Sequence, residues 1–215
     1  MPVRFLPFVN GEIYHVFNRG SEKRVIYQDR RDYNRFLKSI QYYQLQGPKP
    51  KFSHFSKKNI FNPNAANKIV DILAFCLMPN HFHLLVKQVN DGGITEMLTK
   101  LSLSYTKYFN TRYKRVGPLF QGEFKAVHIE NGQQLIHVSR YIHLNPIVSF
   151  LIKDIEKYEF SSYPEYIQKI PDGFCSTKEV LGFFKSPESY KQFVADQTDY
   201  GQTLEEIKHQ LLEEI

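Results

Sequence analysis

The sequence lacks long hydrophobic runs and has very little cysteine. No apolar stretch approaches the roughly 18 residues that a membrane-spanning helix requires. The first 16 residues contain no long apolar segment of the kind found in secretion signals, so we do not expect export. The two cysteines, Cys76 and Cys175, form no CxxC pair, which disfavours a thiolate zinc site and a disulfide framework. These absences favour a cytoplasmic protein without membrane partners.

The signatures of several enzyme classes are missing as well. The sequence contains no GxGxxG dinucleotide fingerprint, no GxxxxGK[ST] phosphate loop, no HExxH zinc motif and no GxSxG nucleophile elbow. No close pair of acidic residues accompanies the most closely spaced histidines. A nuclease that holds two metal ions with carboxylates is therefore poorly supported.

Positive charge is plentiful but unevenly distributed. The net charge is +6, yet residues 1–170 contain 24 basic and 13 acidic residues, whereas residues 171–215 contain 4 and 9. We therefore predict a basic domain, residues 1–170, followed by an acidic extension, residues 171–215, with short helices near 177–184, 189–195 and 204–214. A basic domain favours a polyanionic partner, nucleic acid first.

Hydrophobic periodicity in the basic domain predicts a regular order of strands and helices. Strands are predicted at 12–20, 71–77, 81–88 and 120–129. Helices are predicted to follow Asp29, Gly93 and Asn131, the last ending at Asn145–Pro146. The first six elements give the order βαββαβ, which predicts an α+β, ferredoxin-like antiparallel sheet with helices on one face. A further helix and a helical tail follow, and we expect the other sheet face to be free for a ligand.

A lysine-rich loop separates the first predicted helix from the second strand. Residues 48–68 contain three prolines, no acidic residue and five lysines: Lys49, Lys51, Lys57, Lys58 and Lys68. A loop of this length is usually functional or disordered. A solvated insertion and a nucleic-acid contact remain equally good interpretations.

The segment Asn80–Val86, NHFHLLV, is the most distinctive local feature. Side chains alternate along a strand, so His81 and His83 are predicted to share one face about 7 Å apart, with Phe82 facing the helices. Two imidazoles on one face can share a metal ion. An amphipathic strand with two solvent-facing histidines is the simpler alternative.

A second polar pair lies on the helix predicted after Asn131. Tyr141 and Asn145 are four residues apart, which places them on one helical face. A tyrosine hydroxyl is a possible nucleophile and an amide oxygen is a possible metal ligand. In a chain with 14 tyrosines, an aromatic residue at the edge of the core is the simpler interpretation of Tyr141 taken alone.

Four motifs in order carry a family resemblance that covers about Glu12 to Ile167. They are YHVFNRG (14–20), MPNHFHLL (78–85), GPLFQG (117–122) and YIHLNP (141–146). The sequence resembles the REP-associated tyrosine transposases, which are single-tyrosine enzymes of the HUH (His, hydrophobe, His) endonuclease class acting on single-stranded DNA.

The resemblance implies a mechanism and a set of site residues. It implies that His81 and His83 bind a divalent cation, Mg²⁺ or Mn²⁺. Asn145 is the implied third ligand, and His143, two residues before it, is the other candidate for that position. It implies that Tyr141 is the nucleophile, which cuts single-stranded DNA next to a hairpin through a 5′-phosphotyrosine intermediate. Neutral imidazole and amide ligands would hold Mg²⁺ weakly, whereas Mn²⁺ accepts imidazole more readily.

DNA contacts are expected from basic side chains in and around these motifs. The candidates are Arg19, Lys49, Lys51, Lys57, Lys58, Arg112, Lys114, Arg115 and Lys125. The functional unit is expected to be a monomer or a homodimer.

Two other functions remain open. A non-catalytic module could bind single-stranded nucleic acid on an RRM-like sheet, with Tyr14, Phe17 and Phe124 stacking on bases, although no RNP1-like pattern is present. A metal-dependent phosphodiesterase could use the same residues without a covalent step.

Overall fold

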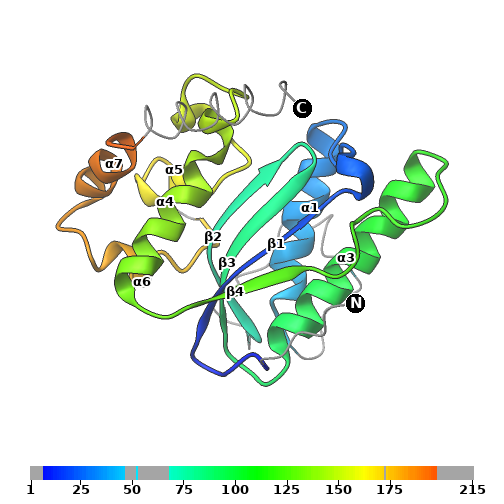
Figure 1. Cartoon of the computed structure of the whole chain (residues 1–215), viewed down its shortest axis with the longest axis horizontal. Coiled ribbons are helices and arrows are strands. Elements are labelled where there is room, and N and C mark those ends of the chain that lie inside the picture. Colours follow the sequence, from blue (N-terminus) through cyan, green and yellow to red (C-terminus); the bar gives the residue numbers. More distant parts are fainter. Residues whose placement is uncertain (1–6, 47–51, 53–67, 172, 198–215) are drawn as a thin grey trace, which may run out of the picture.

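The fold is built on one four-stranded antiparallel sheet (Figure 1). The computed structural model describes residues 7–46, 52, 68–171 and 173–197. The strands are β1 (Ile13–Arg19), β2 (Val70–Met78), β3 (His81–Gln88) and β4 (Lys125–Ile129). The helices are α1 (Arg30–Tyr43), α3 (Gly93–Arg112), α4 (Gly132–Val148), α5 (Tyr163–Tyr166), α6 (Lys178–Leu181) and α7 (Pro187–Ala195), with 3₁₀ turns at Ser21–Lys23 and Ile155–Lys157.

The strand order β2-β3-β1-β4 confirms the predicted ferredoxin-like sheet. Strands β2 and β3 form a tight hairpin around Pro79 and Asn80, as the sequence predicts. The central pair, β1 and β3, is antiparallel and places Phe17 opposite His83. Within the described ranges, no helix combines the length and the apolar character needed to cross a membrane.

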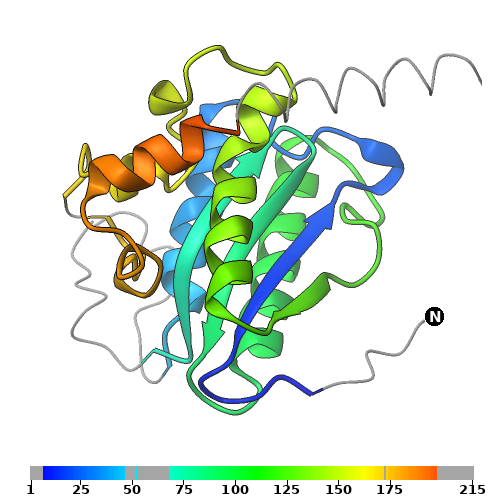
Figure 2. The ribbon, with the colours of Figure 1, turned by 60° about the vertical axis from the view of Figure 1, so that its left-hand side comes forward.

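Alternating side chains give the sheet two different faces. Phe82 and Leu84 of β3 belong to a core that α1 and α3 close, whereas Leu85 belongs to a second core under α4. Figure 2 shows α4 lying in front of the sheet, with α1 and α3 behind it. His81 and His83 have the parity of Leu85 and therefore lie on the α4 face.

The expectation of an open ligand-binding face is wrong for much of the sheet. Helix α4 packs on β2 and also contacts β3 and β4, and α6 and α7 pack against α4. Its apolar residues, such as Leu135 and Ile142, are buried in the second core. The physical reason is that a half-apolar sheet face gains stability when a helix removes it from water.

Side-chain caps fix the starts of two helices where the sequence predicts them. The Asp29 carboxylate accepts hydrogen bonds from the backbone N–H groups of Arg31 and Asp32 at the start of α1. The Asn131 side chain accepts one from Gln134 at the start of α4. The helix that begins at Gly93 runs to Arg112 with its predicted apolar stripe in the core.

Two predicted boundaries differ from the structure. Strand β4 begins at Lys125 rather than Phe120, because Gly122 adopts a left-handed conformation (φ 69°) that interrupts extended backbone. Helix α4 continues through Pro146 to Val148 instead of ending at Asn145. Pro146 and Ile147 are buried in the helix, and their packing outweighs the one backbone hydrogen bond that proline removes.

The C-terminal segment continues the second core. Tyr166, Val180 and Tyr190 are buried against α4 and the sheet. Helix α6 lies within the helical segment predicted at 177–184, and α7 covers the segment predicted at 189–195 but begins two residues earlier, at Pro187. The segment predicted as helical at 204–214 lies outside the described residues. The domain boundary at residue 170 remains a prediction.

A buried histidine connects α4 to this C-terminal packing. His143 is fully buried, with Nδ1 2.7 Å from the Tyr190 hydroxyl and Nε2 2.8 Å from the Ser162 hydroxyl. Burial lowers the pKa of His143 to about 3. The imidazole is therefore neutral in the folded protein at every pH at which the chain is normally handled.

Acidification is expected to destabilise this packing. Between pH 6.5 and about 3 the unfolded chain binds a proton at His143 that the folded chain does not, so the free energy of unfolding should fall by about 1.4 kcal/mol per pH unit. Urea unfolding across this range should show a shallower fall for His143→Gln than for the wild type. Equal slopes for wild type and His143→Gln would contradict the assignment.

Candidate functional site

Three histidines lie together on the α4 face of the two central strands. His81 and His83 come from β3, and His15 comes from β1. The rings of His81 and His83 have centroids 5.0 Å apart, and His15 Nε2 lies 2.9 Å from His83 Nδ1. The prediction that the two β3 histidines share a face is confirmed.

Hydrogen bonds orient the ring of His81. The Asn80 side chain donates through Nδ2 to the backbone carbonyl of Lys23 at 3.2 Å, so its Oδ1 faces His81 Nδ1 at 2.7 Å as an acceptor. His81 must then carry its hydrogen on Nδ1, which leaves the lone pair on Nε2. Asn80 therefore sets the tautomer in which His81 can bind a cation.

Burial keeps the three rings neutral. Burial lowers the pKa of His15 to about 4 and also lowers the pKa of His81. It lowers the pKa of His83 further, and there the neighbouring histidines add to the effect. His83 is only 6% exposed, so the alternative of two solvent-facing histidines is wrong for His83. Neutral imidazoles are the form that binds a metal ion.

Tyr141 projects from α4 over the histidines. Its ring lies edge-on to His83 at 5.4 Å and to His15 at 6.0 Å between centroids. The side chain is 52% exposed, so Tyr141 is not buried in either core. Among the residues that the structure describes, none forms a hydrogen bond with the Tyr141 hydroxyl.

Asn145 lies one helical turn beyond Tyr141. Its Nδ2 donates to the backbone carbonyl of Tyr141 at 2.8 Å, which leaves the amide oxygen free to point elsewhere. Contact with the Asn145 side chain also raises the pKa of His81, opposing the effect of burial. The amide therefore lies beside the His81 ring, on the helical face that it shares with Tyr141.

A polar cavity of about 380 Å³ opens over these residues. Its lining contains Phe17, Asn18, Arg19, Asn80, His81, His83, Gln121, Lys125 and Tyr141. The Arg19 guanidinium donates two hydrogen bonds to Gln121 Oε1, at 3.1 and 3.2 Å. Two of the predicted DNA contacts, Arg19 and Lys125, thus lie at the cavity with Tyr141.

The other predicted basic contacts do not lie at this cavity. Arg112 is bound to the carboxylates of Asp29 and Asp32 at 2.6 Å each, so its charge is compensated. Lys114 and Arg115 follow the end of α3 on the other side of the sheet. The predicted contacts in the lysine-rich loop lie outside the described residues: Lys49, Lys51, Lys57 and Lys58.

The residues present suit a small divalent cation. Among the described residues, no three His, Cys, Asp or Glu side chains group closely enough to hold a metal ion, so a third protein ligand here must be of another type. The Asn145 amide is such a group, and its side chain contacts His81. The donor set of two imidazoles and one amide fits the predicted site.

Sequence reasoning missed His15 and Asn80. A signal for His15 exists in the motif YHVFNRG, where residues 15, 17 and 19 must share one strand face. Which face that is depends on the register between β1 and β3, which places His15 opposite Leu85. Distant strand registers are not encoded in a local pattern.

Comparison with known proteins finds a matching family model and a similar fold. Residues 52–145 match the family described as "Transposase IS200 like", a segment that includes His81, His83, Tyr141 and Asn145. A solved structure of a REP-associated tyrosine transposase bound to a REP hairpin shares the fold, with a TM-score of 0.53 and 15% identity over 82% of this chain and 90% of that chain. No curated protein matches the sequence. The predicted resemblance is thus confirmed: the chain is similar to the IS200-like tyrosine transposases in the sequence around its site and in fold.

Proposed function

We propose that this chain is a metal-dependent DNA strand transferase in which Tyr141 cuts single-stranded DNA next to a hairpin. The observation that carries the proposal is the exposed Tyr141 ring edge-on to His83, on the one sheet face that also presents His81. The hairpin substrate is proposed by analogy with the REP hairpin bound to the similar transposase. Tyr141 contacts His83 of its own chain, which is the arrangement that a site complete in a monomer requires.

His81, His83 and Asn145 would hold the cation. A divalent ion bound there would supply charge stabilisation at a non-bridging phosphate oxygen. The chain's own contribution is orientation: Asn80 fixes the tautomer of His81, and α4 holds Tyr141 over the sheet. Arg19 and Lys125 at the cavity rim supply positive charge for the DNA backbone.

The proposed transfer exchanges one phosphodiester for another. The Tyr141 hydroxyl oxygen bonds to phosphorus, the bond from phosphorus to the 3′ oxygen breaks, and a 5′-phosphotyrosine remains. The exposed Tyr141 hydroxyl gives its proton to solvent, and the departing 3′ oxygen takes a proton from solvent. The phosphodiester bond is conserved in the adduct, so a later 3′ hydroxyl can reverse the step.

The two alternatives predict different products. A phosphodiesterase would release cut DNA without an adduct, and a binding module would not cut at all. The binding module is disfavoured because α4 covers part of the sheet, and because Tyr14 and Phe124 pack with the core on the opposite face. Incubation of the protein with Mn²⁺ and single-stranded hairpin DNA, followed by a denaturing gel, separates all three outcomes.

His15 is expected to act as a positioning residue for the cation ligand His83. For His83 to bind a cation through Nε2, its Nδ1 must carry the hydrogen and donate it to His15 Nε2, 2.9 Å away. Replacing His15 with phenylalanine should weaken Mn²⁺ binding about 10- to 100-fold, the usual cost of losing such a partner. Isothermal titration with Mn²⁺ in the absence of DNA measures the effect.

Two comparisons make this test specific. His15→Asn retains a hydrogen-bond acceptor and should recover part of the Mn²⁺ affinity, and His128→Phe on β4, outside the cavity, should leave it unchanged. The ¹⁵N chemical shifts of His83 should also report a changed tautomer in His15→Phe. Wild-type Mn²⁺ affinity and an unchanged His83 tautomer in that variant would remove His15 from the site.

A further inference from the structure

A second concave surface lies between α1 and α3, facing away from the sheet. We define the α1–α3 groove by its lining residues: Arg31, Arg35, Ser104, Lys107, Tyr108, Thr111 and Arg112. Its volume is about 470 Å³. The sheet-facing sides of the same helices carry buried residues such as Phe36 and Phe109, so the groove and the Tyr141 cavity lie on opposite sides of the sheet.

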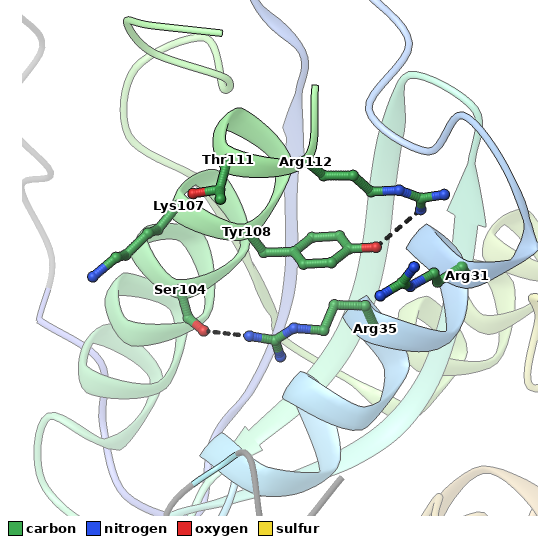
Figure 3. Close-up of a pocket in the computed structure, with 7 residues that line it drawn as sticks. All are labelled: Arg31, Arg35, Ser104, Lys107, Tyr108, Thr111 and Arg112. Carbon is green, nitrogen blue, oxygen red and sulfur yellow. Dashed lines mark hydrogen bonds between the residues drawn. The ribbon is translucent and has the colours of Figure 1, made fainter. Parts of the chain in front are cut away.

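Basic side chains dominate the groove. Figure 3 shows the guanidinium groups of Arg31, Arg35 and Arg112 around Tyr108. Lys107 extends from α3 away from these arginines. Arg31 and Arg35 are four residues apart on α1, so they share its outer face. The groove therefore presents two arginines from one helix toward hydroxyl-bearing residues of the other.

Arg35 is a partly buried cation without an acidic partner among the described residues. Its guanidinium donates only to neutral hydroxyl groups, to Ser39 at 2.6 Å and to Ser104 at 3.0 Å. It also lies 3.6 Å from the ring centre of Phe52. Burial lowers the pKa of Arg35, so its charge is held at a cost that a bound anion would offset.

The other charges in the groove do not supply that anion. Arg112 is paired with both Asp29 and Asp32, and these carboxylates are thereby engaged. Neither Arg31 nor Lys107 forms an ion pair with any residue that the structure describes. Arg31, Arg35 and Lys107 thus leave the groove with a surplus of positive charge.

We propose that the α1–α3 groove binds a backbone phosphate of DNA at a point remote from the cleavage site. Phosphate groups in protein–DNA complexes are bound by arginine and lysine together with serine, threonine and tyrosine hydroxyls, which is the set present here. Arginine presents several donors in one plane and is suited to bind phosphate oxygens in pairs. The proposal rests on the proposed function, because DNA is the polyanion on which that function acts.

The groove would anchor DNA without reading its sequence. A contact to phosphate adds affinity and sets orientation, and its strength depends on salt because bound counterions are released. DNA that reaches from the groove to the Tyr141 cavity would pass around an edge of the sheet. The groove would then hold DNA that is not being cut, independently of the chemistry at Tyr141.

The test measures the salt dependence of DNA affinity by fluorescence anisotropy, with a fluorescein-labelled DNA hairpin carrying a single-stranded flank. Arg31→Gln/Arg35→Gln should raise the dissociation constant about tenfold or more at low salt and reduce the slope of log K against log[salt] by about two. Arg31→Gln alone, at an exposed position, should reduce the slope by about one even if Arg35 proves necessary for folding. Lys153→Gln/Lys185→Gln removes the same charge at exposed positions outside the groove and should keep the wild-type slope.

The outcomes separate this proposal from the proposed function. At saturating DNA the Arg31→Gln variant should still form the covalent adduct, because the groove does not touch the reacting atoms. A wild type that makes no adduct would overturn the proposed function, and the slopes would still decide the role of the groove. The groove proposal would be overturned if both groove variants showed the same slope of log K against log[salt] as the lysine control.

A final comparison distinguishes DNA from a free anion. Titration of the wild type and of Arg31→Gln with inorganic phosphate, followed by NMR of the arginine side chains, measures the groove without DNA. Shifts confined to the groove that weaken in Arg31→Gln, together with the reduced DNA slope, support a phosphate-binding groove used for DNA. Phosphate binding that depends on Arg31 while the DNA slope stays at the wild-type value would identify a site for a free anion and overturn the DNA assignment.

Discussion

Replacement of Tyr141 with phenylalanine is expected to abolish the covalent protein–DNA adduct and to reduce strand cleavage to background. The substitution removes only the hydroxyl oxygen, and that oxygen has no hydrogen-bond partner among the described residues. The ring, which contacts His83 and His15 edge-on, is retained. Stability and DNA affinity should therefore stay near wild type, while the rate falls by at least about four orders of magnitude, the scale seen when a covalent nucleophile is removed.

A buried tyrosine provides the control for this experiment. The Tyr105 hydroxyl donates to the Ile26 carbonyl at 2.6 Å inside the core, on the side of the sheet opposite Tyr141. Tyr105→Phe should cost about 1 kcal/mol of stability through that lost hydrogen bond, yet form the adduct at the wild-type rate. Mass spectrometry of the wild-type adduct should place a 5′-linked nucleotide on the peptide that contains Tyr141.

Each departure from this result has a definite meaning. Cleavage by Tyr141→Phe without an adduct would identify water as the nucleophile and favour the phosphodiesterase. Cleavage with an adduct would assign the reaction to a different tyrosine and remove α4 from the mechanism. If the wild type never cuts single-stranded DNA with any divalent ion, the binding module replaces the enzyme.

The part of the site that sequence could predict is the part fixed by local geometry. Strand alternation alone places His81 and His83 on one face, and helical spacing alone places Tyr141 beside Asn145. Both predictions hold, since β3 and α4 are regular over these residues. Local geometry does not say which faces meet, and the contact between Tyr141 and His83 depends on how α4 packs.

The errors arose where packing overrides local preference. Pro146 ends a helix by its own chemistry, yet α4 continues because Pro146 is buried against its neighbours. The sheet face predicted to be open is covered in part by α4, and this covering also explains why His83 is buried. Here the covering helix carries Tyr141, so the same packing that hides the face brings the proposed nucleophile to the histidines.

Replacement of His81 with alanine is expected to abolish cleavage in Mn²⁺ while the protein stays folded. His81 is the better of the two β3 histidines for this test, because it is only half-buried and lines the cavity. His83→Ala would instead leave a void in a 6% exposed position and strip His15 of its hydrogen-bond partner, so lost activity there would be confounded by lost stability.

The expected size of the effect follows from the donor set. With His81 gone, His83 and the Asn145 amide remain, and two neutral ligands are too few to keep a divalent ion at micromolar to millimolar concentration. Cleavage should fall by about three orders of magnitude or more, as when a principal source of transition-state charge stabilisation is lost. Chelation of divalent ions with EDTA should reduce wild-type cleavage to the same level, and added Mn²⁺ should restore the wild type only.

His128 is the matched control for His81, and DNA binding is the second measurement. His128 lies on β4, is partly exposed and is not part of the cavity lining; its Nε2 lies 2.8 Å from the Glu12 carboxylate. The His128→Ala variant should therefore cut DNA and bind Mn²⁺ as the wild type does. Hairpin DNA affinity measured in EDTA should be the same for His81→Ala and wild type, because the rim cations Arg19 and Lys125 are unchanged. Wild-type cleavage by His81→Ala in Mn²⁺ would exclude the histidine pair as the cation site, and the catalytic role of Tyr141 would then require a different source of charge stabilisation.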